Sequence, residues 1–392
     1  MHLRNGRIGI FDLSTNVFAE EDLIGDHSQE SVSSVRMGRA LMGRHGPDSI
    51  VLGTGVLTGS LIPASCAGTI LSGQKLMPLL GHAGSELKLS GFDFIVVKGK
   101  AIAPGYLWIR DGIVDFVEMP EAHGMDSWQR TDKVRTDQGD SKIQVVSAGS
   151  WCDAASPASS LTVDYWGGED KAGVGAEFGR KNLVAVAFRG MGELEVADAE
   201  AHYSASVSLI KDHLSRLGPG SGLTSYTMHA GRDDFVALVH RTTGCFGCPF
   251  PCRTFLKTEE DPGEMRLVHK EPGYLHYDAL ALAKAFELGL DARESTRILA
   301  MCARAGAEPS SVLAACSAGG RKVDLESVKG LLAKPAEIGL VGGGNFEQSM
   351  QESRDYEVCL GLGLCPRYWG KVGFDLASIS KCAEPALGSR LP

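Results

Sequence analysis

The sequence lacks the features that mark a nucleic-acid-binding or membrane-inserted chain. It contains no basic tract, and its formal net charge is −9 with a pI near 5.7, so an electrostatic footprint for nucleic acid is not expected. No window approaches the roughly 18–20 uninterrupted apolar residues that span a bilayer, and Met1–Thr15 holds no apolar signal core. We therefore expect a cytoplasmic protein with no membrane insertion and no nucleic-acid partner.

The sequence also has no internal repeat and no low-complexity tract. Its 392 residues exceed what one ordinary core accommodates, which favours two or three domains. Hydrophobic residues make up 43% and charged residues 22%, the profile of a globular protein.

Ten cysteines are present, and a chain of this length does not need disulfides to fold. In a reducing compartment, clustered cysteines more often ligate metal, whereas scattered ones act as small core residues. The scattered thiols expected in the core are Cys66, Cys152, Cys302, Cys316 and Cys382.

One tight cysteine cluster stands out, with Cys245, Cys248 and Cys252 in the spacing C-x2-C-x3-C. Soft thiolates hold iron in cubane clusters, and closely spaced cysteines can bind neighbouring corners. A fourth ligand must come from elsewhere in the chain. Zinc is the second interpretation, although no paired C-x2-C half-site exists, and three unrelated core thiols are the third.

The first half of the chain reads as strands mixed with short helices. Asp111–Gly112 between two apolar runs is a strong hairpin signal, and Ser31–Gly43 has the apolar spacing of a helix. The expected strands are Arg7–Asp12, Val17–Glu20, Ile50–Gly53, Asp93–Val97, Tyr106–Arg110, Ile113–Glu118, Lys142–Ser147 and Leu183–Phe188.

Near Ala197 the pattern changes to helices, which predicts an α+β fold with a β-rich domain at 1–200 and helical domains after it. We expect a helical domain at 201–320 that carries the cysteine loop, and a short helical domain at 321–392. The expected helices are Ala199–Leu217, Asp233–Val239, Asp278–Leu290, Ala292–Gly306 and Leu325–Leu332.

Several segments, in their order along the chain, resemble the aldehyde:ferredoxin oxidoreductases. They are Asn5–Thr15, Gly53–Gly59, Gly84–Asp93, Val96–Ala101, Ala172–Ala176, Gly179–Leu183, the cysteine motif, Glu271–Tyr274 and Leu362–Cys365. The resemblance implies an N-terminal domain of two β-sheets followed by helical domains, and a tungsten bis-pterin beside one [4Fe-4S] cluster. It implies Cys365 as the fourth cluster ligand, ahead of Cys359, because Cys365 lies in the family's Gly-Leu-Cys context.

The chain departs from the family in its pterin-binding stretches. Family members are usually longer, and the missing part falls between Cys316 and Cys359. The segment 63–70 has no arginine where the family has one. Lys171 stands near a family arginine, so Lys171, Gly173 and Gly175 are the predicted cofactor-binding residues. A solvated loop lysine is the alternative interpretation of Lys171.

A later helical stretch departs as well. The segment 301–308 lacks the first of two aspartates that the resemblance expects, and Glu308 stands in place of the second. Asp278 is the acid nearest to the position of a family acid, which makes it the candidate catalytic residue. Because Asp278 precedes an apolar helix, a helix cap is the competing interpretation.

These observations lead to three hypotheses. The preferred hypothesis is an iron–sulfur redox protein with a reduced or lost pterin site. It transfers electrons through one [4Fe-4S] cluster within a larger redox complex. The second is an active tungstopterin enzyme that oxidises an aldehyde to a carboxylic acid, with ferredoxin as acceptor. The third is an interaction module with zinc or nothing at the cysteines. Expected partners are ferredoxin or another redox subunit, in a homodimer or a hetero-oligomeric complex.

Overall fold

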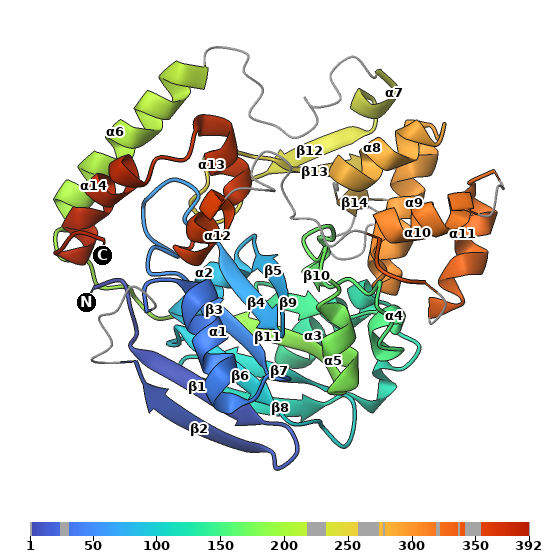
Figure 1. The fold of residues 1–392 in the computed structure, drawn as a ribbon, viewed down its shortest axis with the longest axis horizontal. Helices are drawn as coiled ribbons and strands as arrows, with labels where there is room; N and C mark the ends of the chain where they lie inside the picture. Colours follow the sequence, from blue (N-terminus) through green and yellow to red (C-terminus); the bar gives the residue numbers. More distant parts are fainter. Residues whose placement is uncertain are drawn as a thin grey trace.

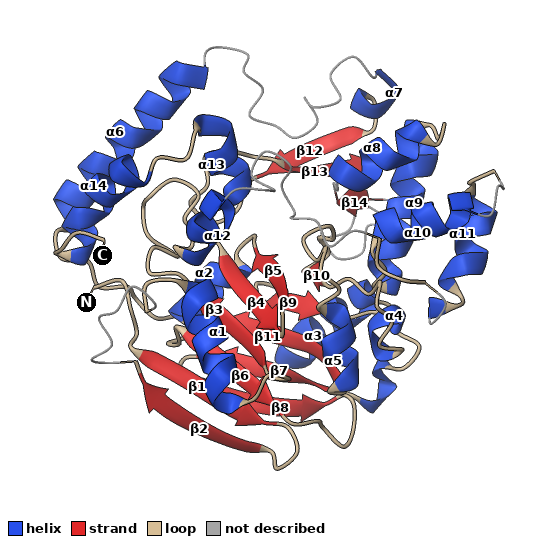
Figure 2. Cartoon of the chain, viewed as in Figure 1, coloured by secondary structure: helices blue, strands red, loops and turns tan. Residues whose placement is uncertain are grey.

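The computed structural model describes residues 2–23, 31–217, 233–257, 274–276, 279–318, 322–335, 338–341 and 354–391. Two packed sheets with short helices form the N-terminal part, and mostly helical segments follow them (Figure 1). Figure 2 shows the strands of the two N-terminal sheets in the lower part of the molecule and most of the later helices above them. The predicted α+β class and the two N-terminal sheets are confirmed.

The first sheet has the strand order β2-β1-β6-β3-β4-β5. Strands β1 and β6 pair in parallel, and the other neighbours are antiparallel. The strands are β1 (Arg7–Asp12), β2 (Val17–Asp22), β3 (Ile50–Thr54), β4 (Gly68–Ser72), β5 (Lys75–Leu79) and β6 (Phe94–Lys98), with helices α1 (Ser34–His45) and α2 (Ala83–Leu89) between them.

The second sheet has the order β10-β9-β11-β7-β8. Its strands are β7 (Gly105–Arg110), β8 (Ile113–Glu118), β9 (Gln144–Ser147), β10 (Thr162–Val163) and β11 (Leu183–Arg189). The segments between them form η1 (Pro120–Ala122), α3 (Ser127–Gln138), α4 (Ser150–Asp153) and α5 (Gly175–Arg180). The predicted Asp111–Gly112 turn joins β7 to β8, and both of its residues have positive φ.

A shared apolar core lies between the two sheets, where Leu52 and Ile95 of the first sheet pack with Leu107 and Val186 of the second. On its outer face, the first sheet packs against α1 through Leu41 and its neighbours. The second sheet packs against α3 in the same way. Because both faces are covered, strands such as β3 are buried along their whole length, as their unbroken apolar sequence indicates.

The rest of the chain forms two groups of helices above the sheets, with a small sheet of order β12-β13-β14 between them (Figure 1). One group contains α6 (Ala199–Leu217), α12 (Arg354–Gly361), α13 (Pro366–Val372) and α14 (Leu376–Leu387). The other contains α7 (Asp233–Val236), α8 (Ala279–Glu287), α9 (Ala292–Ala305), α10 (Pro309–Ala318) and α11 (Leu325–Leu332). The small sheet consists of β12 (Val239–Thr243), β13 (Arg253–Lys257) and β14 (Tyr274–His276).

One expected helix is wrong in part. The helix predicted over Asp233–Val239 ends at Val236, and Val239 begins strand β12. Four β-branched residues lie in 239–243 and the paired 253–257, which suits strands better than a helix. The domain boundaries at 200 and 320 stay predictions. No helix in the described ranges is long and apolar enough to cross a membrane.

Candidate metal and cofactor site

The cysteine motif lies on the connection of an antiparallel hairpin. Strand β12 ends opposite the start of β13, with Thr243 paired to Arg253. The intervening loop carries Cys245, Cys248 and Cys252. Its backbone is fixed near Cys245 by a hydrogen bond that the Phe246 N–H donates to the Gly81 carbonyl over 3.0 Å.

The distant Cys365 comes from the loop between α12 and α13, where it caps the start of α13. That loop is joined by backbone hydrogen bonds to the segment 57–67 of the first domain. The Cys365 N–H donates to the Ala64 carbonyl over 2.9 Å, and the Ala67 N–H donates to the Gly363 carbonyl over 2.9 Å. Gly363 has φ of +95°, and a Cβ there would lie 2.2 Å from Thr58 Oγ1, so only glycine permits this approach.

The structure brings the four predicted ligands into one buried region. Cys245, Cys252 and Cys365 belong to a single apolar core, and Cys248 packs against it. Electrostatic interaction with Cys245 and Cys365 also reaches the thiols of Cys248 and Cys252. Within the described ranges, no three Cys, His, Asp or Glu side chains are grouped tightly enough to hold one metal ion. A cubane instead places each of four thiolates on a different iron atom.

A fifth thiol, Cys66, lies in the same region, and sequence reasoning missed it. Cys66 is fully buried, as expected of a core thiol, but it lies in the same apolar core as Cys245 and Cys365 and affects the pKa of both. The only signal in the sequence was its place shortly after the segment Gly53–Gly59.

Two arginines lie beside the thiols and were also missed. Arg367 Nη1 lies 3.4 Å from Cys252 Sγ. Arg253 is buried, and its Nη2 lies 3.1 Å from Glu169 Oε1. The neighbouring positions of these arginines in the sequence, directly after Cys252 and two residues after Cys365, were the available signal.

The pKa shifts in this region differ from one thiol to the next. The hydrogen bond with Cys66 lowers the pKa of Cys245, which burial alone would raise. Cys66 likewise lowers the pKa of Cys365, whereas its own pKa is raised by these hydrogen bonds and by burial. Burial raises the pKa of Cys252 to about 11, although the positive charge of Arg367 opposes it.

Glu169 is a buried carboxyl at the edge of the thiol region. Burial raises its pKa to about 7, although the charge of Arg253 acts in the opposite direction. Its Oε2 atom has no hydrogen-bond partner among the described residues.

The predicted cofactor residues Gly173 and Gly175 lie in the loop before α5 and at the first residue of that helix, where most of the backbone N–H groups are paired. The buried Asp170 carboxylate accepts hydrogen bonds from the backbone N–H groups of Leu161, Ala172, Val174 and Gly175 at 2.9–3.2 Å. A Cβ at Gly175 would lie 2.7 Å from Cys152 Sγ. The loop thus packs against its own domain.

Lys171 is also paired within the protein. Its Nζ lies 2.8 Å from Glu308 Oε1, and the two side chains are 8% and 3% exposed. The second oxygen of Glu308 accepts hydrogen bonds from the Ser311 N–H at 2.6 Å and the Ser311 hydroxyl at 2.8 Å. The interpretation of Lys171 as a solvated loop lysine is therefore wrong, because the residue is buried.

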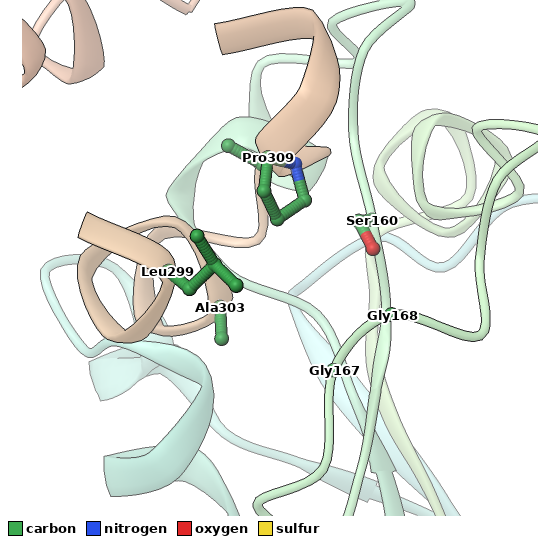
Figure 3. Close-up of a pocket in the computed structure, with 7 residues that line it drawn as sticks. Ser160, Gly167, Gly168, Leu299, Ala303 and Pro309 are labelled. Carbon is green, nitrogen blue, oxygen red and sulfur yellow. The ribbon is translucent and has the colours of Figure 1, made fainter. Parts of the chain in front are cut away.

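A small pocket lies between the 160–168 loop and the helices α9 and α10 (Figure 3). Leu299, Ala303 and Pro309 face Ser160 and the two glycines across it. No charged side chain is among its lining residues in the described part, which are Ser160, Gly167, Gly168, Leu299, Ala303, Ala307 and Pro309. Asp278, the candidate catalytic residue, lies outside the described residues.

Comparison with known proteins finds relatives of the N-terminal part of the chain. The family model for the N-terminal domain of aldehyde ferredoxin oxidoreductase matches residues 41–190. The tungsten-containing aldehyde ferredoxin oxidoreductase of Pyrococcus furiosus is 25% identical over 189 residues, which cover 46% of this chain and 31% of the relative. That of Pyrococcus abyssi is 27% identical over 189 residues, covering 46% and 30%.

Residues 41–190 are therefore related in sequence to the N-terminal domain of the aldehyde ferredoxin oxidoreductases. The resemblance inferred from the sequence motifs is confirmed. The matched stretch spans about a third of the length of these curated relatives.

A solved structure extends the likeness in fold to nearly the whole chain. The active-site complex BamBC of benzoyl coenzyme A reductase, in complex with 1,5-dienoyl-CoA, superposes with a TM-score of 0.70. The superposition covers 95% of this chain and 64% of the other, at 15% sequence identity. At that identity the likeness concerns the fold alone.

Proposed function

We propose that this chain is an iron–sulfur redox protein that holds one [4Fe-4S] cluster on Cys245, Cys248, Cys252 and Cys365. The observation that carries the proposal is the meeting of a hairpin loop and a distant helix start at one buried group of thiols. Such a cluster, when bound, supplies one-electron transfer.

The protein's own residues suit this role. Cysteine binds iron as the deprotonated thiolate. Arg253 and Arg367 place positive charge beside the thiols, which favours that form. The buried Phe250 and the partly buried Phe246 restrict water around the loop. Restricted water access and hydrogen bonds to the sulfurs are the means by which a protein sets the reduction potential.

We infer further that the pterin site is reduced or lost. A pterin phosphate needs backbone N–H donors or cations. The N–H donors around Gly175 are occupied by Asp170, and the cation of Lys171 is paired with Glu308. The small pocket next to Glu308 is lined by no charged side chain in the described part of the chain (Figure 3). The residues around this position therefore satisfy one another and do not fit a bound phosphate.

The alternative is an active tungstopterin enzyme that oxidises an aldehyde with ferredoxin as acceptor. It is favoured by the names of the curated relatives, which are tungsten-containing. We prefer an electron-transfer subunit that works with ferredoxin or another redox subunit in a larger complex, because the BamBC neighbour is itself named as a complex.

Iron content and visible absorbance of the full chain, purified without oxygen, test the cluster. We expect the broad visible absorbance of a bound iron–sulfur cluster, which C245S removes or strongly weakens. The matched control is C382S, because Cys382 is equally a buried thiol of the same apolar core but pairs with Ser206. A wild-type protein with zinc in place of iron, or a C245S spectrum equal to that of wild type, contradicts the proposal.

A further inference from the structure

A lysine in the N-terminal part of the chain is completely buried. Lys88 lies in the last turn of α2, and its side chain is excluded from solvent. Its Nζ donates hydrogen bonds to the carbonyls of Gly55 and Val56, each over 2.8 Å. A buried ammonium group needs such acceptors, and the two carbonyls would be left unsatisfied without this donor. The lysine therefore connects α2 to the loop 55–58.

The lysine is itself held by its own domain. The Asn5 side-chain amide donates to the Lys88 carbonyl over 2.7 Å. The backbone N–H groups of Asn5 and Gly6 donate to the buried Asp93 carboxylate over 3.1 and 2.7 Å. The negative charge of Asp93 in turn attracts the ammonium group of Lys88. The amine is thus a fixed point from which the loop 55–58 is held.

The loop 55–58 supports the segment that carries Cys365. The Leu57 N–H donates to the Leu362 carbonyl over 3.0 Å. A Cβ at Gly55 would lie 2.1 Å from the Leu362 carbonyl carbon, and one at Gly363 would lie 2.2 Å from Thr58 Oγ1. The loop therefore contacts the backbone two and three residues before Cys365, and it leaves that backbone little room to move.

The hairpin that carries the other three proposed ligands is fixed at different points. The Phe246 N–H donates to the Gly81 carbonyl over 3.0 Å. Arg253, which follows Cys252, pairs with Glu169 over 3.1 Å. A displacement of the loop 55–58 is therefore expected to act on Cys365 before it acts on the hairpin.

We propose that Lys88 is a positioning residue of the cluster site. Through the carbonyls of Gly55 and Val56 it fixes the loop on which the Cys365 segment rests, and so sets the orientation of one of the four ligand side chains. The inference rests on the cluster proposed above. Residues that orient a metal ligand from outside affect both the retention of the metal and its electronic properties.

The test uses full-length protein purified without oxygen and measures two quantities. They are the rate of iron release to a chelator and the electron paramagnetic resonance spectrum of the reduced cluster. K88M removes the donor and fills most of the same space. The matched control is K181M, because Lys181 is also buried and donates to a backbone carbonyl, that of Gly99, over 3.1 Å.

We expect K88M to release iron about tenfold or more faster than wild type, because two buried acceptors lose their donor. Its spectrum should differ from that of wild type, since Cys365 changes its orientation. K181M should match wild type in both measurements. An unchanged spectrum in K88M overturns the proposal even if iron is released faster, because a less stable fold alone speeds that release.

T58V tests the same loop if K88M does not fold. The Thr58 hydroxyl donates to the Ala67 carbonyl over 2.6 Å, and valine keeps the shape of the side chain without this bond. T58V should also alter the spectrum, and a wild-type spectrum would contradict the role of the loop. Wild-type protein without iron would refute the cluster itself. That failure is distinguishable because it is seen before any variant is compared.

Discussion

The buried pair of Lys171 and Glu308 gives a sharp test of whether the pterin position has become part of the protein core. If the lysine is a structural partner, removing its charge leaves the Glu308 carboxylate buried at 3% exposure. Burial alone would raise the pKa of Glu308, but the charge of Lys171 and the donors of Ser311 outweigh it and lower that pKa. The substitution K171M keeps most of the length of the side chain and removes the charge.

Breaking one side of a buried ion pair costs about 3–5 kcal/mol of unfolding free energy, so K171M should unfold at a clearly lower urea concentration. E308Q should also lower the free energy of unfolding. The double variant K171M/E308Q should lose less stability than the two single variants lose together, and the difference, the coupling energy, should be about 2–3 kcal/mol. The pair also predicts a pH effect. The pKa of Glu308 is lower in the folded than in the unfolded protein. The carboxylate therefore stabilises the fold at pH values above its unfolded-state pKa, and this stabilisation is lost as the pH falls through its folded-state pKa.

Urea denaturation followed by far-ultraviolet circular dichroism measures these differences, with K75M as the matched control. Lys75 Nζ and Glu177 Oε1 are similarly close, at 2.7 Å, but the two side chains are 29% and 19% exposed, so their pair should contribute about 1 kcal/mol or less. A K171M protein as stable as wild type would refute the structural role of Lys171. If wild-type protein also bound tungsten and K171M did not, Lys171 would be a cofactor ligand.

Three further predictions concern the cluster segments and one buried lysine. C365S should lose most of the iron while C359S keeps it, and the opposite order would make Cys359 the fourth ligand. G55A should lower iron retention, because a Cβ at Gly55 would lie 2.1 Å from the backbone that precedes Cys365; iron equal to wild type would contradict the close approach. Burial lowers the pKa of Lys88 to about 7, against the attraction of Asp93. Since the unfolded state then binds more protons between about pH 7 and 10.5, stability should rise with pH there by up to about 1.4 kcal/mol per unit, and K88M should remove that rise.

Much of the fold was predictable, because local signals and burial agree. Helix α6 has the predicted bounds Ala199–Leu217, as strand β1 has those of Arg7–Asp12 and β8 those of Ile113–Glu118. In these segments the apolar period matches the face that packs, and turn residues mark the ends. The observed bounds differ from the predicted ones where a capping residue sets the start of a helix. Helix α1, for example, begins after its N-cap Ser33 and not at Ser31.

The candidate site was predictable only in part. The spacing of Cys245, Cys248 and Cys252 predicts a metal loop, but the β12–β13 hairpin that presents it depends on pairing between strands too short to be recognised alone. The place of Cys66 beside Cys365 depends on contacts between loops far apart in the sequence. The ion pair of Lys171 required knowing that Glu308 lies against it. Contacts between distant segments produce no periodic pattern in the sequence.

The central claim is that the chain binds an iron–sulfur cluster but has a reduced or lost pterin site. Metal analysis of the full-length protein, purified without oxygen from cells supplied with iron, tungstate and molybdate, tests it most directly. The account predicts about four iron and four sulfide per chain, with neither tungsten nor molybdenum. About one tungsten per chain together with pterin would contradict it and establish the tungstopterin enzyme.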